Sequence, residues 1–206
     1  MIKLLISSTN RSDVGHLNPL ISSVNLDNSF KTTLLINQIQ NKFVKNRELK
    51  SLTGFERVSV KKYTYRTINN SVSNQLKLIR KIIKNTGNFL ADNKFDFFIC
   101  LGDRFETLVI AQVAFEYGIP IIHFHGGEDT FGSKDNHYRK LISILAKYHF
   151  VSHSQYMSNL QKLGIKKSSI YNVGALSVEK LQNTKFIALE KLQNLSLIHI
   201  SEPTRP

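Results

Sequence analysis

Short apolar runs alternate along the chain with longer stretches in which apolar residues return at helical spacing. The short runs predict buried strands, and a return every three to four residues predicts helices. Strands are expected at residues 3–8, 31–36, 58–65, 97–101, 119–124, 149–152 and 170–173. Helices are expected at residues 17–24, 71–90, 105–117, 136–148 and 155–163, and residues 37–57 predict a loop or an irregular helix.

This alternation predicts one α/β domain over residues 1–175. Strands that are apolar on both faces are typical of parallel sheets covered by helices on both sides. A chain of 206 residues is long enough to give such a domain a full core. We therefore expect a doubly wound, Rossmann-like parallel sheet.

Polar clusters follow three of the expected strands, at residues 9–13, 102–106 and 125–129. In open parallel sheets, ligands bind where the carboxyl ends of the strands lead into helix N-termini. We therefore expect the three clusters to meet in one crevice. Their charged side chains include Arg11, Asp13, Asp103, Arg104 and Glu128.

Two of these clusters have both a functional and a purely structural interpretation. Gly102 permits a sharp turn into a helix whose N-terminus favours an anion near Asp103 and Arg104, but an Asp cap beside a solvated Arg explains the same pattern. Gly126 and Gly127 allow main-chain amides to reach phosphate or sugar oxygens, or they form an ordinary turn. The residues alone leave these alternatives open.

A helix that carries Arg139 follows Asp135, which we expect to act as its N-cap whatever else it does. His123 and His125 alternate on an expected strand and should share one face. A metal pair is disfavoured because no third ligand has suitable spacing, so a role in the core or in lining a site is expected. The sequence also lacks a G-x-G-x-x-G loop, a Walker A motif and a nucleophile elbow, and neither a metal nor a cofactor is expected.

The chain is basic, with a formal net charge of +13. This charge is compatible with a nucleic-acid or membrane-surface binder, but the lysines are scattered and no basic cluster is interleaved with aromatic residues. We therefore expect neither partner. No apolar run approaches the ~20 residues of a membrane span. Cys100 is the single cysteine, which favours the cytoplasm.

Three motifs carry a family resemblance. They are Leu-Gly-Asp-Arg-Phe-Glu-Thr-Leu at 101–108, Gly-Ile-Pro-Ile-Ile-His-Phe-His-Gly-Gly-Glu at 118–128 and Asp-Asn-His-Tyr-Arg at 135–139. Their order and spacing resemble UDP-N-acetylglucosamine 2-epimerases, and most of all the bacterial hydrolysing branch. The resemblance covers nearly all of residues 1–176. The opening loop departs from the family's usual Gly-Thr-Arg, because it reads Thr9-Asn10-Arg11.

The resemblance implies a GT-B architecture, in which two Rossmann-like domains hold a UDP-sugar in the cleft between them. It implies anti elimination of UDP to a 2-acetamidoglucal, followed by addition of water with inversion at C2. The product would be N-acetylmannosamine or a related sugar for sialic or legionaminic acids. The resemblance implies no cofactor. It implies that the full-length protein forms a homo-oligomer.

The resemblance also assigns roles to residues. Asp103 and Asp135 match the family's catalytic carboxylates, and His125 occupies the position of a glutamate that is catalytic in the other branch. A histidine there suits general acid or base chemistry near neutral pH. Glu128 ranks below Asp103 and Asp135 and instead holds its loop or contacts substrate. The expected substrate-binding residues are Arg11, Asp13, Arg104, Gly126, Gly127, Glu128 and Arg139.

The last part of the chain is expected to lie outside this domain. Residues 176–194 resemble the start of the crossover to a second domain, and residues 195–206 resemble a translated sequencing adapter, with a genuine disordered tail as the alternative. On that interpretation the chain is inactive alone. The competing functions are a GT-B glycosyltransferase domain, a non-catalytic nucleotide-sugar-binding module and a nucleic-acid binder.

Overall fold

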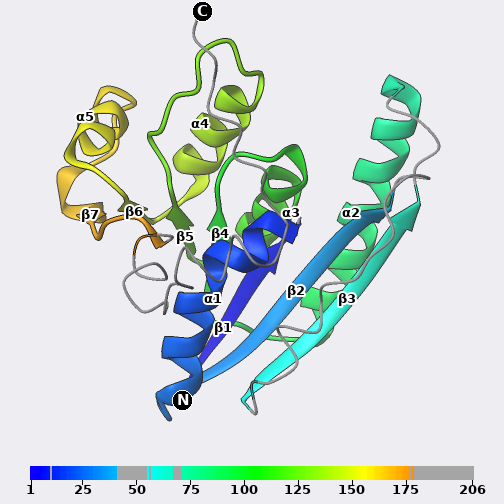
Figure 1. Ribbon diagram of the computed structural model, residues 1–206. Helices are drawn as coiled ribbons and strands as arrows, with labels where there is room; N and C mark the ends of the chain where they lie inside the picture. The colour runs from blue at the N-terminus through cyan, green and yellow to red at the C-terminus, as the bar shows by residue number, and fades with distance from the viewer. Residues whose placement is uncertain (10, 41–54, 56, 67–70, 177, 179–206) are drawn as a thin grey trace, which may run out of the picture.

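The described residues form a parallel sheet with helices on both faces (Figure 1). The computed structural model describes residues 1–9, 11–40, 55, 57–66, 71–176 and 178, and only the backbone of residues 11, 12, 14 and 40. The strands are β1 (Ile2–Ser8), β2 (Phe30–Gln40), β3 (Val58–Arg66), β4 (Phe97–Leu101), β5 (Ile121–Phe124), β6 (Tyr148–Val151) and β7 (Ile170–Asn172). The predicted doubly wound fold is confirmed.

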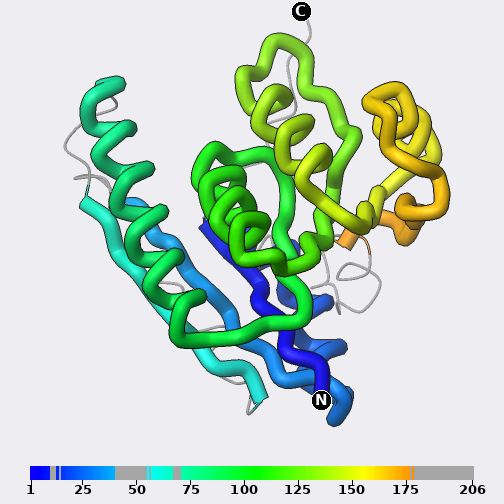
Figure 2. The backbone as a smooth tube through the Cα atoms, turned by 180° about the vertical axis from the view of Figure 1, so that it is seen from behind, coloured from blue at the N-terminus to red at the C-terminus, as the bar shows by residue number. Residues whose placement is uncertain are grey.

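Two layers of helices cover the sheet. The helices are α1 (Arg11–Leu26), α2 (Val72–Asp92), α3 (Phe105–Glu116), α4 (Asp135–Leu145) and α5 (Ser154–Lys162). One face packs against α1, and the opposite face packs against α2, α3 and α4. Figure 2 shows these three helices from behind, with α3 between the other two. Among the described residues, no helix has the length and apolar character that crossing a bilayer requires.

Apolar side chains on both faces of the central strands build this core. Leu4 and Ile6 of β1 lie in the cluster under α1, whereas Leu5 between them lies in the cluster under α2 and α3. All three are at most 4% exposed. Successive side chains of a strand point to opposite faces, so a continuous apolar run is needed where both faces are covered.

The strand order is β3-β2-β1-β4-β5-β6-β7. The chain builds outward from β1 to β3 on one side, then returns to place β4 on the other side of β1. The connections after β1 and β4 therefore leave the sheet in opposite directions, which opens a crevice at the carboxyl edge. This reversal positions the candidate site.

Three boundaries differ from the sequence-based expectation by three residues or more. Strand β2 continues to Gln40, so the expected loop over 37–57 is wrong at its start, because these residues pair with β3 up to Gln40↔Arg66. Helix α1 begins at Arg11 rather than 17, and Asp13 lies in its first turn. Helix α4 ends at Leu145 rather than 148, because Tyr148 pairs with Ile122 in the sheet.

Candidate active site

The connections after β4, β5 and β6 lie side by side at the carboxyl edge of the sheet. The Gly102 N–H donates to the Phe124 carbonyl at 3.1 Å, and the His125 N–H donates to the Phe150 carbonyl at 2.9 Å. These bonds continue the strand pairing beyond the last ladder residues. They fix the backbones that carry two of the predicted motifs next to each other.

An ion pair joins the first of these connections to α4. The Arg139 guanidinium, only 6% exposed, donates through Nη2 to Asp103 Oδ2. Its Nη1 donates to the Glu128 carbonyl at 2.7 Å and to Asn136 Oδ1 at 3.3 Å. Arg139 therefore ties Asp103 to the loop after β5, and the side chain of Asp103 is not a helix cap. Helix α3 has Arg104 as its N-cap residue, without a side-chain capping bond.

The second connection carries a His–carboxylate pair. His125 Nδ1 lies 2.6 Å from Glu128 Oε1, and Ser152 Oγ donates to the same oxygen at 2.9 Å. Burial raises the pKa of Glu128, but the hydrogen bond and charge of His125, the Ser152 hydrogen bond and the Arg139 charge outweigh it and leave that pKa below its usual value. Glu128 is therefore a carboxylate at neutral pH.

The prediction that His123 and His125 share one strand face is wrong. β5 ends at Phe124, and the backbone of His125 turns to φ 61. His123 is fully buried, with Nε2 2.8 Å from the Gly102 carbonyl and Nδ1 3.0 Å from Ser143 Oγ. Burial lowers the pKa of His123 to about 3, so its ring is neutral and serves the packing of α4 against the sheet.

The glycine pair after His125 is required by protein contacts. A Cβ on Gly127 would lie 2.4 Å from the Tyr156 carbonyl oxygen, and Gly127 has φ 78. A Cβ on Gly126 would lie 3.0 Å from both His123 Nδ1 and Ser143 Oγ. Asn159 Nδ2 also donates to the Gly127 carbonyl at 2.9 Å. These glycines therefore seat the loop on α4 and α5.

The expected N-cap role of Asp135 is wrong. Asp135 is the first residue of α4, after Lys134 as N-cap residue, and its N–H donates to Ser133 Oγ at 3.2 Å. The Asp135 side chain is exposed. It precedes Arg139 by four residues, so both lie on the same face of α4. Asp135 therefore lies one helical turn from the ion pair that holds Asp103.

A buried carboxylate lies close to Arg104 at the same edge. Glu106 is 1% exposed, and its Oε2 lies 3.4 Å from Nε of Arg104, whose side chain is 42% exposed. Burial raises the pKa of Glu106, the Arg104 charge opposes this, and the Asp13 charge adds to it. Glu106 was not predicted as a site residue. The available signal was a charged residue among the apolar residues that begin α3.

In the opening loop, the N–H and Oγ1 of Thr9 both donate to Asp13 Oδ2 at 3.0 Å. Asp13 therefore fixes the turn between β1 and α1. The Arg11 side chain lies outside the described residues, so its predicted role stays a prediction. The structure thus joins Asp103, Arg139, Glu128 and His125 in one run of contacts, and it pairs Arg104 with Glu106.

A cavity of about 680 Å³ opens at the same edge, beside the serine that bonds to Glu128. It is lined by Phe124, Phe150, Ser152, Val173, Gly174, Ala175, Leu176 and Val178. Aromatic edge-to-face packing of Phe150 against Phe124 and Tyr171 supports its floor. An apolar hollow with a polar group at its rim is typical of a small-molecule site.

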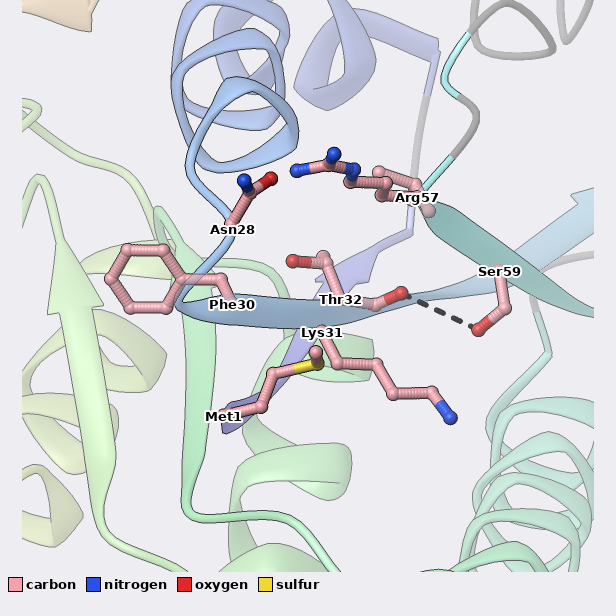
Figure 3. A pocket seen from close by; sticks show the side chains of 8 residues that line it. Met1, Asn28, Phe30, Lys31, Thr32, Arg57 and Ser59 are labelled. Atoms are coloured by element: carbon pink, nitrogen blue, oxygen red, sulfur yellow. Dashed lines mark hydrogen bonds between the residues drawn. The ribbon is translucent and has the colours of Figure 1, made fainter.

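A second cavity of about 640 Å³ lies at the other end of the sheet, near the start of β2 and β3. In Figure 3 the charged ends of Lys31 and Arg57 lie on opposite sides of β2. They do not converge on one ligand, so we do not assign a site there.

Within the described part of the chain, no three His, Cys, Asp or Glu side chains are grouped to hold a metal ion.

Comparison with known proteins supports the motif analysis. Residues 45–202 match the family profile described as UDP-N-acetylglucosamine 2-epimerase. The chain is 36% identical over 97 residues to polysialic acid biosynthesis protein P7 of Escherichia coli, covering 47% of this chain and 25% of that protein. It is 38% identical over 96 residues to the GDP/UDP-N,N'-diacetylbacillosamine 2-epimerase (hydrolyzing) of Campylobacter jejuni, covering 47% and 25%.

A solved structure agrees in fold. The UDP-GlcNAc 2-epimerase from Neisseria meningitidis bound to UDP-GlcNAc superimposes with a TM-score of 0.71 at 22% identity, covering 95% of this chain and 51% of that one. The chain thus spans about half the length of that enzyme and has the fold of a GT-B-type N-terminal domain. The profile match covers more than half of the chain, and the chain therefore belongs to the UDP-N-acetylglucosamine 2-epimerase family.

Proposed function

We propose that this chain supplies the acid–base half of a hydrolysing UDP-N-acetylhexosamine 2-epimerase. One observation carries the proposal: Asp103, Arg139, Glu128 and His125 form a continuous run of contacts at the carboxyl edge of the sheet. Asp135 lies one helical turn from this run. The order of strands around β1 and β4 makes this edge the expected ligand crevice.

The reaction needs two proton transfers at one carbon. In the elimination, a base removes the proton from C2, the C–H electron pair becomes the C1=C2 double bond, and the C1–O bond breaks to release UDP. In the hydration, the oxygen of water bonds to C1 and a proton reaches C2 from the opposite face of the ring. Because the C2 proton is weakly acidic, this chemistry requires positioned acid–base groups and stabilisation of the departing diphosphate.

The candidate residues divide into two groups. We assign proton transfer to Asp103, His125 and Asp135, which present two carboxylates and an imidazole at this edge. We assign substrate contact to Arg11, Asp13, Arg104, Gly126 and Gly127, with Arg139 holding Asp103 in place. Arg104 is suited to a diphosphate, because its guanidinium-bearing side chain is 42% exposed.

The substrate is proposed to be a UDP-linked N-acetylated hexosamine. The names of the relatives support this class, and UDP-N-acetylglucosamine and UDP-N,N'-diacetylbacillosamine are both within it. We propose that residues 1–175 act together with a second domain of the kind that completes the cleft in longer relatives. We place the reaction in the cytoplasm, with which the single buried cysteine agrees.

The test is an acceptor-free assay of the full gene product that carries this chain. Incubation with either UDP-sugar should release UDP and the free 2-epimerised sugar, as read by NMR. Asp103→Asn should reduce kcat by about 100-fold or more, because it removes a carboxylate from the acid–base set. Asp92→Asn, in the exposed last turn of α2, is the matched control and should leave kcat unchanged.

The rival functions give different results in this assay. A glycosyltransferase would release UDP only when a sugar acceptor is present, and a non-catalytic binding module would release none. Full activity in Asp103→Asn would contradict the assignment of the site even if the overall reaction were observed.

A further inference from the structure

We propose that Glu128 and Ser152 are positioning residues that hold His125 as the base of the reaction, in a Ser152–Glu128–His125 arrangement. The proposal rests on the proposed function and names how one of its groups is prepared for proton transfer. It does not follow from the motif resemblance, which ranks Glu128 only as a loop or substrate contact.

The geometry places two donors on one carboxylate oxygen. His125 Nδ1 lies 2.6 Å from Glu128 Oε1, and Ser152 Oγ lies 2.9 Å from the same atom. An ionised carboxylate can only accept hydrogen bonds, so Nδ1 must carry the proton. In the neutral ring Nε2 then has the lone pair, and Nε2 is the nitrogen that remains available to a substrate.

The backbone holds this pair in place. His125 has φ 61, which is unusual for a residue other than glycine and is sustained only where the surroundings enforce it. Its N–H donates to the Phe150 carbonyl on β6, and the carbonyl of Glu128 accepts from Arg139 on α4. Gly127 also packs closely against the Tyr156 carbonyl of α5, and together these contacts fix both ends of the loop.

The chemistry follows from this arrangement. When Nε2 takes the C2 proton, the ring becomes an imidazolium whose second N–H still points at the Glu128 carboxylate. That negative charge stabilises the cation, as in other His–carboxylate pairs. Ser152 holds the carboxylate in the orientation that Nδ1 needs. The proton can then leave Nε2 to solvent or to product without any change in Glu128.

Charged and titratable groups near His125 come from three elements. Glu128 lies on its own loop, Arg139 reaches the loop from α4, and His123 lies two residues earlier on β5. Arg139 is already paired with Asp103, and the ring of His123 is neutral. Glu128 is therefore the charged group whose removal should affect the His125 ring. This identifies Glu128→Gln as the informative substitution.

The experiment compares Glu128→Gln, Ser152→Ala and Glu116→Gln in the full gene product. Glu128→Gln should lower kcat roughly 10- to 100-fold with KM changed less than about threefold, because the pair acts through His125 and not on substrate. Ser152→Ala should lower kcat less, and Ser152→Thr should restore it.

Glu116→Gln serves as the control, since Glu116 is an exposed carboxylate at the end of α3, and it should change neither kcat nor KM. A second measurement tests the His125 tautomer directly and does not require an active enzyme. Nitrogen-15 NMR of the unmodified protein, with the His125 signals assigned by their loss in His125→Gln, should show the Nδ1–H tautomer.

The outcomes separate the two proposals. An Nε2–H tautomer, an unchanged kcat in Glu128→Gln, or a loss confined to KM would overturn the arrangement. Absence of any epimerisation by the unmodified protein would instead overturn the proposed function, and the tautomer would still report on the arrangement itself.

Discussion

Gly127 shows how much a single position can depend on contacts that the sequence does not display. The sequence indicates that two glycines follow a strand, which fits both a ligand-binding loop and an ordinary turn. The structure adds the Tyr156 carbonyl 2.4 Å from the place of a Cβ. Such a neighbour lies about thirty residues away in the chain, so no local pattern reveals it.

Gly127→Ala should therefore be more destabilising than the backbone conformation alone requires. A positive φ costs an alanine about 1–2 kcal/mol, and the contact with Tyr156 and Leu160 adds about 1–3 kcal/mol of overpacking. Gly132→Ala is the matched control, because Gly132 has φ 70 and nothing within 4 Å of its Cβ position. Urea unfolding of both variants measures the difference, and equal losses would refute the packing argument.

The two histidines of β5 and its following turn show the same limit. Their alternation predicted a shared face, yet the backbone turns at His125 and the two rings have different partners. The motifs did locate Asp103 and His125 at one edge, because parallel strands put their carboxyl ends together. What they could not supply was the pairing of Arg139 with Asp103, which depends on where α4 crosses the sheet.

At the scale of elements, the seven strands were predictable because both faces of most of them are buried. Short continuous apolar runs between helical stretches are typical of strands buried on both faces. The end of β2 was not predictable, since Asn37 and Gln38 are polar. Asn37 is nevertheless fully buried, and its Oδ1 accepts from the Tyr65 hydroxyl at 2.9 Å. A long-range partner thus decides where this strand ends.

This contact leads to a prediction for the β2–β3–α2 unit. The Tyr65 hydroxyl donates to Asn37 of β2 and accepts from Asn85 of α2 at 3.3 Å. Tyr65→Phe should therefore cost about 1–3 kcal/mol, because it leaves the buried Asn37 oxygen without its donor. Tyr63→Phe is the control on the same strand, as the described residues offer its hydroxyl no hydrogen bond. Denaturant unfolding followed by circular dichroism compares them, and equal stability of the two variants would contradict this account.

At the scale of the whole molecule, buried neutral histidines make the fold sensitive to acid. Burial lowers the pKa of His149 to about 4 and that of His123 to about 3, from an ordinary value of 6.5. Between pH 6.5 and the lowered pKa of each histidine, the unfolded chain binds a proton that the folded protein does not. The free energy of unfolding therefore falls as the pH drops below about 6.5, and the contribution of these histidines is fully present above that pH. Each group contributes a slope of up to about 1.4 kcal/mol per pH unit.

His149→Gln should make this dependence shallower. Unfolding free energies measured from pH 7.5 down to pH 4.5 should fall less steeply in the variant, because one of the two buried groups is gone. His137→Gln, at an exposed position of α4, should keep the slope of the unmodified protein. Identical slopes in all three proteins would show that buried histidines do not govern acid unfolding.

The place of β1 in the sheet has a consequence for how the chain is made. One edge of β1 pairs with β2, which follows it closely, but the other edge pairs with β4 at residues 97–101. During synthesis, that second edge stays open until residues 97–101 have left the ribosome. An unpaired apolar strand can bind other chains, so early release or pausing before β4 is the stage at which aggregation should be greatest.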